Sequence, residues 1–162
     1  MVKKESKIVV SNTGPIISLL LIDSLTILKK LYGAVLITNE VLKEIRNKQQ
    51  KEILEKELHQ KWLINIKPPR LDVIHDLDKG EETSIALALQ FTNSLFLTDD
   101  FQAREFATFI GLKAMGTLGV LLLAKYKKII PNLKELIQQL TLKERWYSKE
   151  LISQVLREVN EL

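Results

Sequence analysis

The chain has 162 residues, of which 46% are hydrophobic and 27% are charged, and its formal net charge is +4. These values are typical of a globular protein and predict one domain over residues 1–162, with residues 131–162 as a helical extension. Because the chain has no cysteine, a disulfide framework and a thiolate metal site are excluded. The only histidines, His59 and His75, are expected on the surface, which argues against a multi-histidine zinc site.

No apolar run approaches the roughly 20 residues that a membrane helix needs. The apolar stretch after Lys3 and Lys4 is interrupted by Asn12 and Pro15, and no small-residue cleavage site follows it. We therefore expect a cytoplasmic protein with no membrane partner. The positive charge is compatible with a polyanionic partner but does not require one.

Short β-branched runs alternate with longer helical patterns, which favours an α/β fold with a parallel sheet flanked by helices. Strands are predicted at residues 7–10, 34–37, 63–66, 94–98 and 113–115. Helices are predicted from about residue 15, at 38–61 with a break near 48–50, at 80–91, 101–110 and 118–128, from 133 to 140, and after 148. The helix at 80–91 is apolar around much of its circumference, so we expect it to be buried on more than one side.

Polar residues follow the predicted strands or open the next helix. Asn12 follows the first strand, and Asp99 and Asp100 follow the strand at 94–98. Glu81 lies in the first turn of the helix at 80–91, and Glu44 shares a helix face with Glu40, four residues before it. Because parallel strands deliver their carboxyl ends to one edge of a sheet, these side chains can converge there. Oxygen ligands without cysteine suit Mg²⁺ or Mn²⁺.

Each of these acids also has a purely structural interpretation. Asp78 and Glu81 have the spacing of a capping box, and so do Asp99 and Gln102. Glu40 and Glu44 can lie in solvent, paired with Lys43 or Lys48. Spacing alone leaves these alternatives open.

Three stretches in this order resemble a PIN domain: "IVVSNTGPIISLLLIDSLTILKKLYGAVLITNEVLKEI", "DKGEETSIALALQFTNSLFLTDDFQARE" and "GLKAMGTLGVLLLAK". The chain is most similar to a subgroup of small prokaryotic, VapC-like PIN proteins long described as a domain of unknown function. The resemblance implies a three-layer α/β/α sandwich with a short, mainly parallel sheet. It also implies a Mg²⁺- or Mn²⁺-dependent ribonuclease, in many members the toxin of a toxin–antitoxin pair.

Matched to the family motifs, the second, third and fourth catalytic acids fall on Glu44, Glu81 and Asp100, and Asp99 is a further candidate metal ligand. Thr13 and Thr98 match hydroxyl residues of the motifs and, with Thr117, are candidate substrate-binding residues. Thr117 opens a predicted helix, where free N–H groups can receive a phosphate; a simple helix cap is the alternative.

The chain departs from the family at its first acid, where Asn12 stands in "SNT". An amide keeps one carbonyl oxygen as a ligand but loses the negative charge, so metal affinity should fall. Relatives also carry an acid where this chain has Thr83, and Glu82 does not replace it because neighbouring helical residues point about 100° apart.

Three hypotheses follow. The first is a PIN-type endoribonuclease in which Glu44, Glu81, Asp100 and Asn12 hold Mg²⁺ or Mn²⁺ and cleave single-stranded RNA. The second is a catalytically degenerate PIN module that binds RNA or a partner protein. The third, a nucleotide- or phosphate-binding α/β protein, lacks the expected glycine-rich loop after a strand.

The partners that these hypotheses imply are RNA, an antitoxin protein and a second copy of the chain, for which residues 118–124 and the C-terminal helix are candidate surfaces. Packing within the monomer is the alternative use of those residues. A cluster near residue 145 combines positive charge with aromatic rings, which suits either RNA contact or anchoring of the last helix. Its members are Lys143, Arg145, Trp146, Tyr147 and Lys149.

Overall fold

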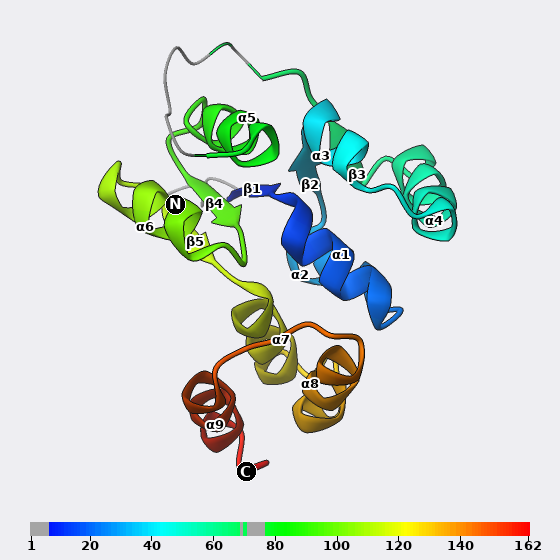
Figure 1. Ribbon diagram of the computed structural model, residues 1–162, viewed down its shortest axis with the longest axis vertical. Coiled ribbons are helices and arrows are strands. Elements are labelled where there is room, and N and C mark those ends of the chain that lie inside the picture. Colours follow the sequence, from blue (N-terminus) through cyan, green and yellow to red (C-terminus); the bar gives the residue numbers. More distant parts are fainter. Residues whose placement is uncertain (1–6, 69, 71–76) are drawn as a thin grey trace, which may run out of the picture.

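The computed structural model describes residues 7–68, 70 and 77–162 of the chain. Within them, five parallel strands form one sheet in the order β3-β2-β1-β4-β5. The strands are β1 (Ile8–Ser11), β2 (Val35–Ile37), β3 (Leu63–Asn65), β4 (Ser94–Leu97) and β5 (Lys113–Met115). Figure 1 shows β1 between β2 and β4, with the chain building the sheet outward from β1 first on one side and then on the other.

Helices connect the strands and follow the last one. In chain order they are α1 (Thr13–Leu21), α2 (Thr26–Tyr32), α3 (Asn39–Glu44), α4 (Lys48–His59), α5 (Lys79–Ala88), α6 (Phe101–Phe109), α7 (Thr117–Tyr126), α8 (Leu133–Leu142) and α9 (Lys149–Glu158). Several begin where a polar side chain accepts a hydrogen bond from the backbone of the first turn. These N-cap residues are Thr38, Asn47, Asp78, Asp100, Asn132 and Ser148.

The sheet separates two hydrophobic clusters, because alternate residues of a strand point to opposite faces. Val9 and Leu95 pack with buried residues of α1, α2 and α7, whereas Val10 and Phe96 pack with α5 and α6. In Figure 1, α5 and α6 accordingly lie across the sheet from α1 and α2. This arrangement confirms the three-layer α/β/α architecture that the sequence predicted.

Helices α8 and α9 extend the first of these clusters. Buried residues such as Leu133 of α8 and Val155 of α9 belong to the same cluster as Leu121 of α7, and Figure 1 shows the three helices together at one end of the molecule. The run at residues 118–124 is used within the chain. Its buried members are Leu118, Val120, Leu121 and Ala124.

Three details differ from the sequence prediction. The break between α3 and α4 falls at residues 45–47 rather than 48–50, because Asn47 Oδ1 accepts a hydrogen bond from Gln50 N at 3.0 Å and so opens α4. Helix α5 ends at Ala88, whose carbonyl oxygen accepts a hydrogen bond from Ser94 Oγ at 2.9 Å. Helix α7 ends at Tyr126 rather than at residue 128, with Lys127 as its C-cap.

His59 is exposed in α4, as expected, whereas His75 lies outside the described residues. None of the helices found in residues 7–68, 70 and 77–162 is both long enough and apolar enough to span a bilayer.

Candidate active site at the carboxyl edge of the sheet

The strand order reverses between β1 and β4, so the carboxyl ends of these two adjacent strands mark the topological switch point of the sheet. Ligands of open α/β sheets bind in the crevice at such a point. Asn12 follows β1, and its N–H donates to Leu97 O of β4 at 2.8 Å. Thr98, Asp99 and Asp100 follow β4 directly. The topology therefore brings together the ends of the two strands that carry the candidate residues.

Asn12 is a buried residue with one unused acceptor. Its side chain is 5% exposed, and Nδ2 donates to Thr98 Oγ1 at 3.4 Å. Its Oδ1 is buried and has no hydrogen-bond partner among the described residues. Because buried polar atoms are nearly always hydrogen-bonded, this unpartnered amide oxygen is an acceptor that a ligand or a water can satisfy.

Glu44 lies at the end of α3, against the first turns of two other helices. The hydroxyl of Thr13, from α1, donates to Glu44 Oε2, and Gly80 N, from α5, donates to Glu44 Oε1 at 3.0 Å. A Cβ at Gly80 would overlap with Glu44 Oε1 and lie 2.7 Å from Oε2. Gly80 is therefore what allows the carboxylate to reach the start of α5. Of the two glutamates for which the sequence suggested a surface ion pair, only Glu40 forms one in the described part of the chain. Its Oε1 lies 3.1 Å from Lys43 Nζ.

Glu81 belongs to a capping box at the start of α5, as its spacing predicted. Asp78 Oδ1 accepts from Glu81 N at 2.8 Å, and Asp78 N donates to Glu81 Oε2 at 3.1 Å. The pKa of Glu81 is raised to about 7, chiefly by burial and further by the charges of Asp78, Asp100 and Glu44, against the lowering effect of the Asp78 hydrogen bond. The carboxylates of Glu44 and Asp100 are thus near enough to contribute to the raised pKa of Glu81.

Asp100 is the N-cap of α6. Its Oδ1 accepts from Ala103 N at 2.7 Å, and its N–H donates to Thr98 Oγ1 at 3.2 Å. The capping interpretation from the sequence was therefore right about the helix but wrong about the residue, which is Asp100 and not Asp99. Because the buried hydroxyl of Thr98 accepts from the Asn12 side chain and from the Asp100 backbone N–H, it fixes the Asn12 side chain relative to the start of α6.

Asp99 contacts a different set of groups from Asp100. Its Oδ1 accepts from Thr117 N at 2.7 Å and its Oδ2 from Thr117 Oγ1 at 2.6 Å. Oδ2 also lies 3.4 Å from Ser18 Oγ, 3.5 Å from the Tyr147 hydroxyl and 3.7 Å from Arg145 Nη2. Gly116, and not Thr117, is the N-cap of α7. Both Thr117 donors considered for a phosphate are therefore bonded to Asp99.

A comparison with family models decides the assignment of the fold. A family model described as DUF3368, PIN domain, matches residues 8–161. This chain belongs to the PIN domain family. Among curated proteins, none matches the chain. The PIN domain is a nuclease-type fold, and the match covers the sheet, the carboxyl-edge residues and the C-terminal helices.

The donor chemistry at the carboxyl edge of this PIN domain suits a hard divalent cation. The available groups are three carboxylates and the unpartnered Asn12 Oδ1, all of them oxygen ligands. A cation there would offset the burial and the neighbouring negative charges that raise the pKa of Glu81. As they stand, however, no three His, Asp or Glu side chains of the described part are grouped closely enough to hold an ion. Binding would therefore require side-chain movement, such as release of Glu44 Oε2 from the Thr13 hydroxyl.

Two contributors to this edge, Gly80 and Ser18, could not be assigned from sequence motifs, and the place of Arg145 and Tyr147 beside Asp99 could not be predicted. Gly80 directly precedes Glu81, but its close approach to Glu44 has no signal in the sequence. Ser18 and Arg145 are joined by a hydrogen bond of 2.9 Å from Arg145 Nε to Ser18 Oγ, and Arg145 Nη2 donates to Gly14 O at 3.3 Å. Burial, followed by the Asp99 charge, raises the pKa of Tyr147, which keeps its hydroxyl protonated. Arg145 and Tyr147 thus anchor the chain between α8 and α9, while Trp146 remains 75% exposed.

Proposed function

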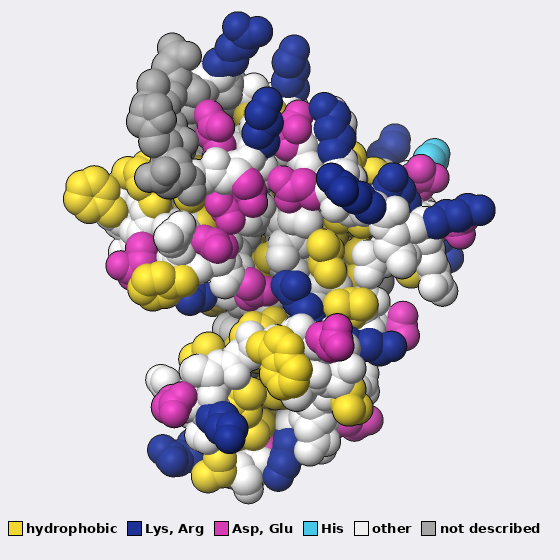
Figure 2. Space-filling model, in the orientation of Figure 1, with side chains coloured by type: hydrophobic (Ala, Val, Ile, Leu, Met, Phe, Trp, Pro, Cys, Tyr) yellow, Lys and Arg dark blue, Asp and Glu magenta, His cyan; other side chains and the backbone are white. Residues whose placement is uncertain are grey.

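We propose that this PIN domain is an endoribonuclease that depends on Mg²⁺ or Mn²⁺ and hydrolyses phosphodiester bonds of single-stranded RNA. The observation that carries the proposal is the unpartnered oxygen of Asn12, buried at the switch point of the sheet, where the charges of Asp100 and Glu44 also contribute to the raised pKa of Glu81. Buried oxygen acceptors and crowded negative charge are what a divalent cation stabilises. Figure 2 shows several acidic side chains close together over α3 and α5, with Lys and Arg side chains around them.

The residues have separate roles in this proposal. Glu81, Asp100 and Glu44 supply carboxylate ligands, and Asn12 supplies a neutral fourth oxygen. When bound, the cation supplies an activated water and neutralises charge on the phosphate. Thr98 holds Asn12 and Asp100 in register through its hydroxyl, and the Gly80 N–H orients Glu44. Asp99 is a positioning residue that fixes the start of α7 through Thr117.

The test compares RNA cleavage by four proteins in Mn²⁺: the native chain, Asn12→Asp, Asp100→Asn and the control Asp23→Asn. Asp23 is an exposed acid between α1 and α2, so its substitution removes the same charge away from the candidate ligands. We expect the native protein and Asp23→Asn to cleave, Asp100→Asn to lose activity, and Asn12→Asp to cleave faster. Cleavage by Asn12→Asp alone would instead identify the natural chain as a degenerate module, the second hypothesis.

We further propose that the nuclease acts as the toxin of a toxin–antitoxin pair. This rests on the similarity to small prokaryotic PIN proteins, and it requires that the free protein damages cellular RNA. Expression of the native chain in a bacterial host should arrest growth, whereas Asp100→Asn at the same protein level should not. Relief of the arrest by the product of an adjacent small reading frame would identify the antitoxin. Equal growth with both proteins would contradict the toxin role and leave the nuclease proposal to the cleavage assay.

A further inference from the structure

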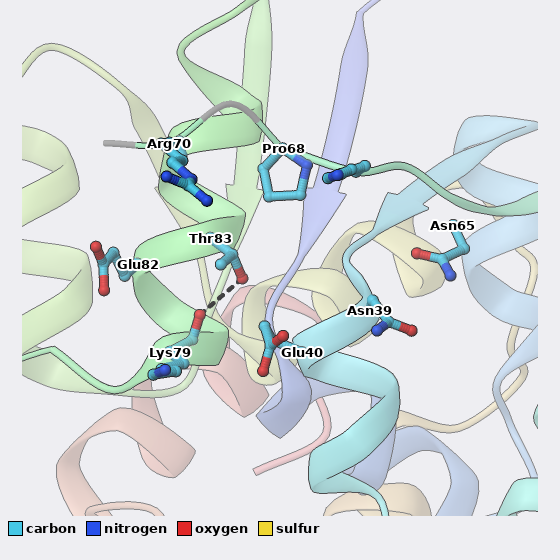
Figure 3. Close-up of a pocket in the computed structure, with 10 residues that line it drawn as sticks. Asn39, Glu40, Asn65, Pro68, Arg70, Lys79, Glu82 and Thr83 are labelled. Carbon is cyan, nitrogen blue, oxygen red and sulfur yellow. Dashed lines mark hydrogen bonds between the residues drawn. The ribbon is translucent and has the colours of Figure 1, made fainter. Parts of the chain in front are cut away.

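A second polar feature lies beside the candidate active site, in an open groove between α3 and α5. The groove has a volume of about 910 Å³. It is lined by Asn39, Glu40, Asn65, Lys67, Pro68, Arg70, Lys79, Glu82, Thr83 and Ala86. Figure 3 shows that α3 contributes one wall and α5 the other, while Pro68 and Arg70 come from the segment that passes over the groove after β3.

The groove offers charged and hydrogen-bonding groups beside a comparable amount of apolar surface, to which Pro68 and Ala86 contribute. Three of the lining side chains are cationic, Lys67, Arg70 and Lys79, and all three are exposed. Two are acidic, and one of these, Glu40, is paired with Lys43 at 3.1 Å. The amides Asn39 and Asn65 are also exposed and can both donate and accept hydrogen bonds. This chemistry fits a flexible polyanion that also carries hydrogen-bonding groups, rather than an apolar small molecule.

The groove is joined to the candidate site by α5. Lys79, Glu82 and Thr83 line the groove, and Gly80 and Glu81, between them in the same first turns, face Glu44 and the carboxyl edge. The floor is fixed, because Thr83 Oγ1 lies 2.9 Å from Thr38 Oγ1 and donates to Lys79 O at 2.7 Å. A chain bound at Glu81 can therefore continue into the groove along one helix.

On the other side of the candidate site, at the start of α7, protein groups already occupy the hydrogen-bond donors. There the N–H and the hydroxyl of Thr117 both donate to Asp99, and Arg145 and Tyr147 lie against the same carboxylate. The start of α7 thus has its donors occupied, whereas the cations of the α3–α5 groove have no carboxylate partner within 4.0 Å in the described part of the chain.

We infer that the α3–α5 groove is a binding site for single-stranded RNA and carries the strand away from the candidate active site. Lys67, Arg70 and Lys79 contact successive phosphates, and Asn39 and Asn65 contact base edges, which a single strand exposes and a duplex conceals. The inference rests on the proposed function for the identity of the nucleic acid, but the groove can be tested without any cleavage.

The test measures binding of a fluorescent 12-nucleotide RNA by anisotropy, with EDTA present so that no cleavage occurs. The triple variant Lys67→Gln, Arg70→Gln, Lys79→Gln is compared with the control triple Lys30→Gln, Lys51→Gln, Lys113→Gln, which removes the same charge from exposed lysines of α2, α4 and β5. Each phosphate contact to a single strand contributes about 0.7 to the slope of log K against log salt concentration, so three contacts contribute about 2. We expect the groove triple to lose at least about tenfold in affinity and about 2 in slope, and the control triple to lose much less.

A second measurement locates the RNA without changing the cations. Because the native chain has no cysteine, Asn65→Cys and the control Lys113→Cys each introduce a single thiol for alkylation. RNA should slow alkylation of the thiol introduced by Asn65→Cys and leave the control unaffected. Equal protection of both thiols, or equal affinity losses in the two triples, would overturn the groove assignment.

The two proposals fail in different ways. If the native protein cleaves RNA while the groove triple binds and cleaves like the control triple, the groove assignment falls and the nuclease stands. If the groove triple alone loses RNA binding and no protein cleaves, the groove stands and the nuclease falls. Circular dichroism and thermal melting establish that each variant is folded.

Discussion

Glu44 Oε1 accepts a hydrogen bond from Gly80 N at 3.0 Å, and the carboxylate occupies the space where any other residue at position 80 would place its Cβ. This contact joins the end of α3 to the first turn of α5 and brings the charge of Glu44 next to Glu81. A residue without a side chain thus determines where a candidate metal ligand lies.

The first prediction concerns Gly80→Ala. The new methyl group would lie 2.7 Å from Glu44 Oε2, so Glu44 has to move, and misplaced catalytic groups reduce rates by as much as about 100-fold. Alanine favours the helix by up to about 1 kcal/mol, but overpacking costs about 1–3 kcal/mol, so we expect a small net loss of stability. RNA cleavage and Mn²⁺ affinity from isothermal titration calorimetry measure the effect.

The matched control is Gly14→Ala, in the first turn of α1. A Cβ there would lie 3.5 Å from its nearest neighbour, Asp99 Cβ, which is an ordinary contact. We expect this variant to keep its Mn²⁺ affinity and to be as stable as the native protein or more stable. If both alanine variants behave alike, the close contact of Glu44 with Gly80 has no functional importance.

The sequence predicted the order of the strands along the chain and the position of the candidate site, but not its close contacts. Short β-branched runs and polar strand ends are local features, so they could be recognised without the structure. The different directions of Asp99 and Asp100 could not, because they depend on α7 and on Arg145, 46 positions further along the chain from Asp99. The role of Gly80 could not be predicted for the same reason, because it depends on the packing of α3 against α5.

The second prediction separates two neighbouring acids. Asp99→Asn places an amide among donors from Thr117, Tyr147 and Arg145, so one or more hydrogen bonds to a charged group are lost. Such bonds contribute about 1.5–3 kcal/mol each, and we expect the free energy of unfolding to fall by about that amount. In Asp100→Asn the amide oxygen still caps α6, because Asn and Asp are comparable N-caps. The free energy of unfolding should therefore fall by less than about 0.5 kcal/mol.

Urea unfolding, followed by circular dichroism, compares these two variants, and cleavage assays use the folded fraction of each. The expected pattern is that Asp99→Asn mainly lowers stability and Asp100→Asn mainly lowers activity. The reverse pattern would show that Asp99, and not Asp100, is the acid that acts in the site.

The third prediction is a pH dependence of stability caused by Glu81. Its pKa is about 7 in the folded protein, whereas the pKa of a glutamate in an unfolded chain is about 4.3. The folded state therefore binds more protons between these values, and the free energy of unfolding falls as the pH rises from about 4.3 to about 7. Glu81→Gln should remove this part of the pH dependence, so the variant gains stability relative to the native protein at pH 8 but not at pH 4.

Melting temperatures in EDTA, measured from pH 4 to pH 8, test the sign of this pH dependence. A difference between the two proteins that stays constant over this range would contradict it.

The fourth prediction concerns the charge that Asn12 lacks. In Asn12→Asp a buried carboxylate replaces the amide, and Thr98 Oγ1 no longer receives the hydrogen bond that Asn12 Nδ2 donates to it. A buried group without a partner costs about 1–3 kcal/mol and a charged one more, so the variant should melt below the native protein in EDTA. Mn²⁺ should reverse the order of the melting temperatures, because the added carboxylate strengthens cation binding. A ligand that binds only the folded state stabilises it by RT ln(1 + [L]/Kd).

Thermal melting over a Mn²⁺ titration measures both effects. The control is Asn47→Asp, at the exposed N-cap of α4, which makes the same chemical change outside the site. If Asn12→Asp responds to Mn²⁺ no more strongly than Asn47→Asp, Asn12 does not face a cation, and the metal-dependent mechanism loses its principal support.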